Sequence, residues 1–208
     1  MEKAICEITA RAFDSFRIEA ESLAATAEVL DKGEFERAVK ALSAAERIGA
    51  SGCGHSGIAC QHFCHLMCCV EQPARFIYPS EAVHGALGFI QKGDAMVLVS
   101  RGGKTDELIQ IANICRGKGA VIIAVTENLS SPLAAGADIV LAMKVTRECD
   151  IYNCQGTTSF AVTNAIFDAL QAAVLEYTGF KNEKFAVIHP GGAVGKRLNG
   201  EKPRAETK

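Results

Sequence analysis

The sequence predicts a three-layer α/β/α sandwich on a five-stranded parallel sheet, preceded by an N-terminal helical arm. From residue 47 onward, short apolar segments alternate with stretches of helical periodicity. Strands that are apolar on both faces are typical of a parallel sheet covered by helices on each side. Right-handed crossovers then give a doubly wound, flavodoxin-like or Rossmann-like fold, in which ligands bind beyond the carboxyl ends of the strands.

The arm spans residues 1–45 and lies outside this alternation. Ile5, Ile8, Phe13 and Phe16 recur at helical spacing with charged residues between them. Gly33 is predicted to break the helix, which resumes at residue 34. We expect the arm to pack on the domain or on another subunit.

One domain is expected over residues 46–198, followed by a polar, disordered tail at 199–208. The predicted strands cover residues 47–52, 74–79, 95–100, 120–126 and 137–143. The predicted helices cover residues 56–70, 105–119 and 157–179, with a short helical stretch after Ser131 and Thr105 as a helix cap.

The composition indicates a soluble globular protein, with 49% hydrophobic and 22% charged residues and a formal net charge of −2. No basic field attracts nucleic acid, and neither a signal peptide nor a membrane span is recognised, so we expect a cytoplasmic protein without nucleic acid or membrane partners. The nine cysteines are irregularly spaced and are expected to be reduced packing residues. His62 and His65 lie one helical turn apart without an evident partner pair, so we expect no metal and no cofactor.

A glycine-rich turn, Gly52-Cys53-Gly54-His55-Ser56-Gly57, joins the first strand to the first helix. Glycines let backbone amides approach an anion, and a helix N-terminus favours negative charge. The alternatives are a purely structural tight turn and a dinucleotide site. The second of these is disfavoured because the next strand, ARFIYP, ends without an acidic residue that could hold a ribose.

A second turn, SRGGKTDE at residues 100–107, follows the strand AMVLVS. It offers two hydroxyls, two glycines and two cations just before a helix. Two such turns on neighbouring strands form a polar cradle that fits one phosphate monoester. The alternative is a well-capped helix whose cations are merely solvated.

The two turns together resemble the sugar isomerase (SIS) domain, whose second turn typically reads S-x-S-G-x-T/S-x-x-E. Three later segments resemble the arabinose-5-phosphate isomerase branch of that family: PSEAVHGALG (79–88), MKVTRECD (143–150) and FAVIHPGGAVGKRL (185–198). The resemblance covers residues 45–198 and implies the SIS fold. Members of this branch often carry a pair of CBS modules after this segment. Here the chain ends about ten residues later, so we expect an isomerase domain alone.

The resemblance assigns phosphate binding to the two turns. Ser56, Ser100 and Thr105 match the phosphate ligands of the family. Gly102 stands where SIS domains commonly have a second serine, which removes one hydroxyl. Arg101, beside it, is expected to supply a charged donor instead.

The resemblance also implies the catalytic groups. Glu107 and Glu148 match the two catalytic-site carboxylates, and His189 matches the catalytic-site histidine. His84 matches a histidine that lines the same pocket. His55 falls where the isomerases have a lysine, which is the clearest departure. Each residue also has a structural alternative, such as a helix-dipole role for a carboxylate in a first turn.

These residue types suit the interconversion of an aldose and a ketose phosphate. The reaction needs a base for the proton beside the carbonyl and an acid for the carbonyl oxygen as a cis-enediol forms. We expect burial to raise the pKa of one carboxylate toward neutrality. A histidine at position 55 would stabilise the enediolate less reliably than a lysine at neutral pH.

The expected substrate pair is D-arabinose 5-phosphate and D-ribulose 5-phosphate. His55 and the segment CDIYNCQG (149–156), which does not resemble the family's Pro-rich stretch, leave a hexulose 6-phosphate as an alternative. A non-catalytic sugar-phosphate-binding module is the second class of function. The resemblance also implies a homodimer or homotetramer whose active sites are shared, with the histidine of the H-P-G-G stretch reaching a neighbour's pocket.

Overall fold

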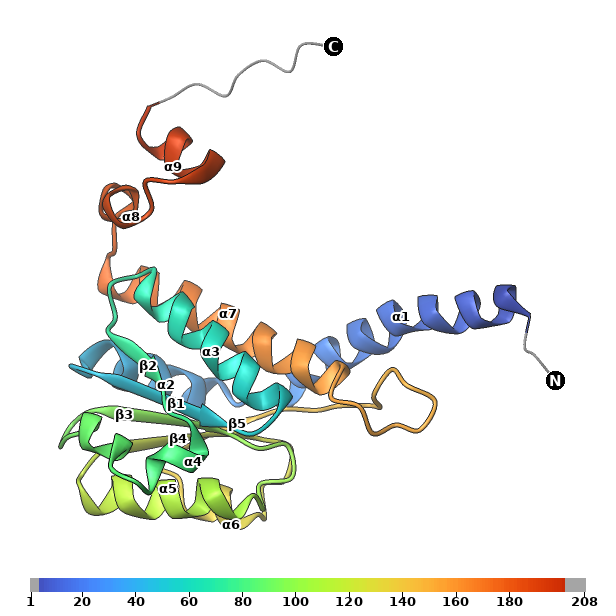
Figure 1. Ribbon diagram of the computed structural model, residues 1–208, viewed down its shortest axis with the longest axis horizontal. Coiled ribbons are helices and arrows are strands. Elements are labelled where there is room, and N and C mark those ends of the chain that lie inside the picture. The colour runs from blue at the N-terminus through green and yellow to red at the C-terminus, as the bar shows by residue number, and fades with distance from the viewer. Residues whose placement is uncertain (1–3, 201–208) are drawn as a thin grey trace.

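The predicted five-stranded parallel sheet is confirmed in the computed structural model, which describes residues 4–200 (Figure 1). Every neighbouring pair of strands is parallel, and the order is β2-β1-β3-β4-β5. The strands are β1 (Ile48–Gly52), β2 (Ala74–Phe76), β3 (Ala95–Val99), β4 (Val121–Thr126) and β5 (Ile139–Ala142). The strand order reverses between β1 and β3, so the switch point of the sheet lies there.

Helices cover both faces of the sheet, which confirms the three layers. One face packs against α2 (Lys32–Ala44), α3 (His55–Cys68) and α7 (Thr158–Thr178). The other packs against α4 (Pro79–Ala82), the 3-10 helix η1 (Ala86–Phe89), α5 (Asp106–Gly117) and α6 (Pro132–Ala135). The central strands are buried along their whole length because both faces are covered.

The second predicted strand ends early. It stops at Phe76, and Pro79 begins α4 at a helix position where a proline is tolerated. The segment that follows thus forms two short helices that the sequence interpretation did not include.

The predicted break at Gly33 is wrong. The first helix, α1, spans Ile5–Val29, and the chain turns at Leu30 and Asp31. Asp31 caps α2 because its side chain accepts a hydrogen bond from the Glu34 amide at 2.9 Å. Gly33 lies inside the first turn of that helix, so the capping carboxylate rather than the glycine sets the break.

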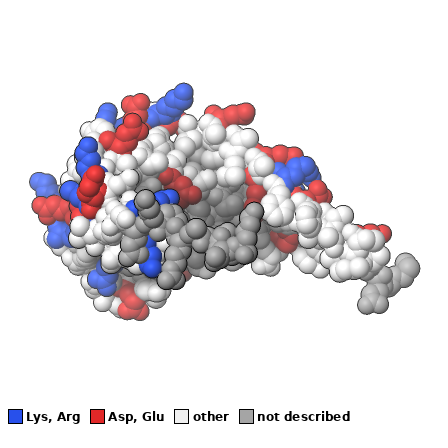
Figure 2. Space-filling view, turned by 90° about the horizontal axis from the view of Figure 1, so that it is seen from above, with Lys and Arg blue, Asp and Glu red and all other residues white. Residues whose placement is uncertain are grey.

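The two halves of α1 differ in their surroundings. The second half packs on the domain: Ser22 and Thr26 are buried, and the Thr26 hydroxyl donates to the Lys144 carbonyl at 2.9 Å. The first half extends away from the domain (Figure 1) and leaves Phe13 and Phe16 exposed. Figure 2 shows that the projecting end of α1 is mostly uncharged surface.

Two further helices, α8 (Asn182–Ile188) and α9 (Gly192–Leu198), follow α7 and were not predicted. Gly179 ends α7 in the left-handed conformation, with φ of 66°. Figure 1 shows α8 and α9 beyond the end of α7, away from the sheet. Asn199 and Gly200 close α9, and the rest of the predicted disordered tail lies outside the described residues. The domain boundaries remain predictions.

By length and composition, α7 is the one helix within residues 4–200 that could cross a membrane. Its position is that of a core helix. Phe167 packs on Phe63 of α3 with ring centroids 4.5 Å apart, and both side chains are fully buried.

Candidate active site

The two glycine-rich turns lie side by side at the switch point of the sheet. Gly52 at the end of β1 pairs with Val99 at the end of β3, so residues 52–57 (the first turn) adjoin residues 100–105 (the second turn). Burial raises the pKa of the Cys53 thiol, and the negative charge of Glu107 raises it further. The first turn is therefore within electrostatic reach of the start of α5, as the sequence predicts.

Close backbone contact explains two of the glycines in the first turn. A Cβ at Gly57 would meet the Gly52 carbonyl oxygen at 2.6 Å, and a Cβ at Gly52 would meet the Ser56 backbone at 2.8 Å. Gly54 precedes α3 with φ of 56°. These glycines have the Gly-x-Gly-x-x-Gly spacing that dinucleotide sites also use, but no acidic side chain ends β2.

The hydroxyls predicted to bind phosphate in the second turn meet each other. Ser100 Oγ lies 2.9 Å from Thr105 Oγ1, and the Gly103 amide donates to Ser100 Oγ at 3.1 Å. Thr105 is the N-cap of α5, but its side chain makes no capping hydrogen bond. Both hydroxyls thus lie at a helix N-terminus, where an anion is stabilised.

A cavity of about 300 Å³ adjoins the first turn on the β2 side. Its lining is uncharged and includes two aromatic rings: Gly52, Cys53, Gly54, Gly57, Gln61, Phe76, Tyr78 and Pro79. This size is at the lower end of the range for small-molecule sites. A second hollow, of about 380 Å³, lies between α2 and α7 and includes neither turn.

Glu148, in the irregular segment after β5, is buried, and both of its carboxylate oxygens accept hydrogen bonds. It is 2% exposed. Its Oε2 accepts hydrogen bonds from the amides of Thr157 at 2.9 Å and Ser159 at 3.1 Å, at the start of α7. Its Oε1 accepts from Arg101 Nη1 at 2.8 Å.

These donors lower the pKa of Glu148 in spite of its burial. Burial alone raises the pKa of this carboxyl, but hydrogen bonds from Ser159 and Thr157 and the charge of Arg101 outweigh it, so the net shift is downward. Glu148 is therefore not the carboxylate whose pKa burial raises toward neutrality. Glu148 is ionised at neutral pH.

Arg101 is paired with two carboxylates that lie outside the two turns. Its guanidinium donates to Glu148 and, through Nε, to Glu127 Oε2 at 2.9 Å. Sequence reasoning missed Glu127. Its position directly after β4, at the carboxyl end of a strand, was the available signal.

Three of the other predicted residues are exposed near the carboxyl ends of the strands or on the β2–β3 connection. Glu107 lies in the first turn of α5. His55 begins α3, and its ring lies 6.3 Å from the ring of Phe160. His84 is exposed between α4 and η1 and is not among the residues that line the cavity. Ser56 is half-buried in the first turn of α3.

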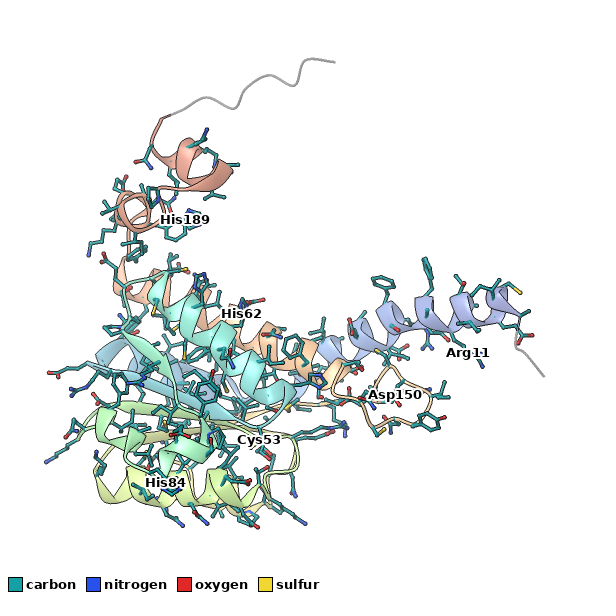
Figure 3. The ribbon with its side chains drawn as sticks, in the orientation of Figure 1. Arg11, Cys53, His62, His84, Asp150 and His189 are labelled. Carbon is teal, nitrogen blue, oxygen red and sulfur yellow. The ribbon has the colours of Figure 1, made fainter. Side chains whose placement is uncertain are left out.

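The fold does not bring His189 to the other predicted residues within one chain. Figure 3 shows His189 and Asp150 toward opposite ends of α7. The His189 ring lies 5.0 Å from the ring of Phe185, and its Nδ1 is buried with no hydrogen-bond partner. His189 thus lies apart from Cys53 of the first turn in a single chain.

The histidines and cysteines of α3 have other neighbours. His62 Nε2 lies 3.5 Å from an Asp168 carboxylate oxygen, and His65 Nε2 lies 3.7 Å from Cys69 Sγ. Within residues 4–200, no three His, Cys, Asp or Glu side chains are grouped so as to hold a metal ion.

Comparisons with known proteins identify the family of this chain. The SIS domain matches residues 41–173. Arabinose 5-phosphate isomerase KpsF of Escherichia coli is 36% identical over 170 residues, covering 81% of this chain and 54% of that protein. The chain therefore spans about half the length of the curated relatives it matches.

Solved structures are similar over most of the chain. A candidate sugar-phosphate isomerase from Listeria monocytogenes has a TM-score of 0.87 and 36% identity, covering 92% of this chain and all of the other. An Escherichia coli CFT073 protein in complex with arabinose 5-phosphate has a TM-score of 0.82 at 24% identity, covering 90% of this chain and all of the other, and so shares the fold. The family profile spans most of the folded part of the chain, so this protein belongs to the SIS domain family.

Proposed function

We propose that this protein is a sugar-phosphate aldose–ketose isomerase that interconverts D-arabinose 5-phosphate and D-ribulose 5-phosphate. The observation that carries the proposal is the pair of hydroxyls of Ser100 and Thr105 in the second turn, which adjoins the glycine-rich first turn at the switch point. Relatives 36% identical to this chain are named arabinose 5-phosphate isomerase, which supports the choice of substrate.

We assign the phosphate to the hydroxyls of Ser56, Ser100 and Thr105, with the Gly102 amide beside them. This arrangement lets an anion meet two helix N-termini, those of α3 and α5. We assign the carbon chain of the sugar to the adjoining cavity of about 300 Å³. We keep His84 as a proposed pocket residue, contributed from the β2–β3 connection.

The proposed reaction is a proton transfer through a cis-enediol. A base removes the proton from C2 of the aldose and returns it to C1, while a proton moves between the oxygens of C1 and C2. Glu107 is exposed beside the first turn and suits the transfer between carbons. We assign stabilisation of the enediolate oxygen to His55, as a neutral donor or as an imidazolium. Glu148, being ionised, supplies fixed negative charge.

We infer that active sites are shared between copies in a homodimer or homotetramer. The support is that His189 lies apart from Cys53 of the first turn in a single chain (Figure 3). Mixing subunits of two inactive variants, His189→Ala and Glu107→Gln, should restore part of the activity because one mixed site would hold both native residues. Full activity of a monomer would contradict this inference.

We also place the protein in the cytoplasm. Cys60 and Cys115 are fully buried among apolar side chains, where reduced thiols act as small packing residues. The net charge of −2 gives no reason to expect a nucleic-acid partner.

The deciding experiment is a substrate panel with purified protein and no added metal. Turnover of arabinose 5-phosphate and ribulose 5-phosphate is expected, and Glu107→Gln should remove turnover while the sugar phosphate still binds in calorimetry. If a hexulose 6-phosphate is turned over faster, the substrate assignment is wrong. If the wild type binds sugar phosphates but turns none over, the protein is a binding module. The fully engaged carboxylate of Glu148 is the observation that favours this second function.

His55→Lys refines the same panel. If lysine raises turnover of arabinose 5-phosphate, the histidine marks a change of specificity or rate within the family. If lysine abolishes all turnover, the histidine is itself an adapted catalytic group.

A further inference from the structure

Arg101 is fixed at both its backbone and its side chain. Its carbonyl oxygen accepts hydrogen bonds from Thr126 Oγ1 at 3.1 Å and from the Glu127 amide at 3.0 Å, both at the end of β4. Its guanidinium donates from Nε to Glu127 at 2.9 Å and from Nη1 to Glu148 at 2.8 Å. The side chain therefore has one defined direction, toward the ends of β4 and β5.

Glu127 connects three segments at this edge of the sheet. Besides Arg101, its Oε1 accepts a hydrogen bond from the Val145 amide at 3.3 Å and lies 3.2 Å from Lys144 Nζ. Its side chain is 21% exposed, and that of Glu148 is 3% exposed. Glu127 thus holds the second turn and the segment after β5 in one arrangement.

We propose that Arg101 and Glu127 are positioning residues for the isomerase: Glu127 orients the Arg101 guanidinium, which holds Glu148 at the start of α7 instead of binding the substrate phosphate. This inference rests on the proposed function. It gives a role to one residue that sequence reasoning assigned to the phosphate and to another that it missed.

The burial of Glu148 explains why, in this proposal, Arg101 does not bind the substrate phosphate. If the guanidinium turned toward the second turn, Glu148 would lose its only side-chain cation within residues 4–200 while remaining nearly inaccessible to water. Removing one partner from a buried ion pair costs far more than an exposed pair contributes. The phosphate is then left to the hydroxyls and amides of the two turns.

Glu148 in turn connects Arg101 to the loop that packs against His55. Glu148 binds the Thr157 amide at the start of α7, and Gly156, one residue earlier, lies against His55. A Cβ at Gly156 would meet His55 Nδ1 at 2.6 Å. Arg101 thereby fixes the loop against which the first-turn histidine packs.

Steady-state kinetics of Arg101→Met test the proposal. We expect kcat to fall by about tenfold or more while KM for arabinose 5-phosphate changes by less than about threefold, since no phosphate contact is lost. The kcat of Arg101→Lys should lie between those of the wild type and Arg101→Met, because an ammonium keeps the charge but not the two fixed N–H directions. Glu127→Gln should act in the same direction and provides a second test if Arg101→Met does not fold. Arg17→Met, which removes two exposed ion pairs on α1, is the matched control and should change neither kcat nor KM.

A pH profile separates positioning from general loss of structure. Loss of the Arg101 charge should raise the pKa of Glu148, so the acid limb of the kcat/KM profile should move to higher pH. The charged groups around this carboxylate are Arg101 and Glu127 on its ion-pair side, Arg147, which donates to the Glu148 carbonyl, and Glu19 of α1 across Cys149. Only Arg101 changes in the variant.

Two results would overturn the proposal. A KM raised by about tenfold with kcat unchanged would make Arg101 a phosphate ligand. An acid dependence of the free energy of unfolding that is the same in Arg101→Met and the wild type would show that Arg101 does not hold Glu148. The unfolding measurement needs no turnover. It therefore tests whether Arg101 holds Glu148 even if the wild type is inactive and the proposed function is wrong.

Discussion

Gly103 is the position where the second turn has least tolerance for a side chain. Its backbone is left-handed, with φ of 64°, and an added Cβ would meet Ser131 Oγ at 2.0 Å and Ser131 Cβ at 2.4 Å. Ser131 is fully buried and caps α6 by accepting a hydrogen bond from the Ala134 amide at 3.2 Å. Gly103→Ala must therefore displace a capping residue that has no free space around it.

The expected loss of stability follows from these contacts. The left-handed conformation costs an alanine about 1–2 kcal/mol. Displacing the Ser131 hydroxyl costs about 1 kcal/mol of helix capping, and the overpacking adds about 1 kcal/mol or more. We therefore expect Gly103→Ala to lower the free energy of unfolding by about 3–4 kcal/mol.

The neighbouring glycine is the control. A Cβ at Gly102 meets nothing within 4 Å, so Gly102→Ala should change the free energy of unfolding by less than about 0.5 kcal/mol. Urea denaturation followed by circular dichroism measures both variants. Equal stability of the two would refute the reasoning, because the two substitutions differ only in the contacts and backbone conformation of the glycine. The folded fraction of Gly103→Ala should also lose activity, since the Gly103 amide holds Ser100 Oγ.

Three further predictions concern other parts of the chain. Asp94 is 1% exposed and accepts from Arg47 Nε at 2.9 Å, so Asp94→Ala should cost about 3 kcal/mol in chemical denaturation, and a cost below about 1 kcal/mol would contradict it. Arabinose 5-phosphate should slow alkylation of Cys53, which lines the cavity, but not of exposed Cys154, as followed by mass spectrometry; equal protection of both thiols would place the ligand elsewhere. Because the pKa of Glu148 is lowered in the folded state, its contribution to stability is present above the ordinary glutamate range and is lost as the pH falls through the folded pKa. The stability difference between the wild type and Glu148→Gln should shrink on acidification, and a pH-independent difference would count against the lowered pKa.

The sheet and the two turns were predictable because their signals are local. Apolar strands between helical stretches indicate a covered parallel sheet whatever the rest of the chain does. Ser100 and Thr105 lie five positions apart, on either side of a glycine pair, so the meeting of their hydroxyls follows from the turn itself. Short helices such as α4, α8 and α9 carry too few residues for their periodicity to stand out.

The environment of Glu148 was not predictable from local pattern. Its cation, Arg101, is 47 positions away. The amides that bind it belong to Thr157, the N-cap of α7, and to Ser159 in the first turn of that helix. Whether burial or hydrogen bonding dominates the pKa depends on that assembly. The same holds for His189, whose role the resemblance implies and whose place in a working site we propose to lie in a second copy of the chain.

His55 and the segment 149–156 were noted separately as departures from the family pattern, and the structure brings them together. The His55 ring lies against Gly156, where any side chain would strike its Nδ1, and against the ring of Phe160. A histidine is shorter than a lysine and is rigid beyond its second rotatable bond, so its direction is set by what it packs on. The loop that follows Glu148 therefore sets the orientation of the one first-turn side chain that departs from the family. The two departures are then a single feature, and an exchange of His55 alone tests only half of it.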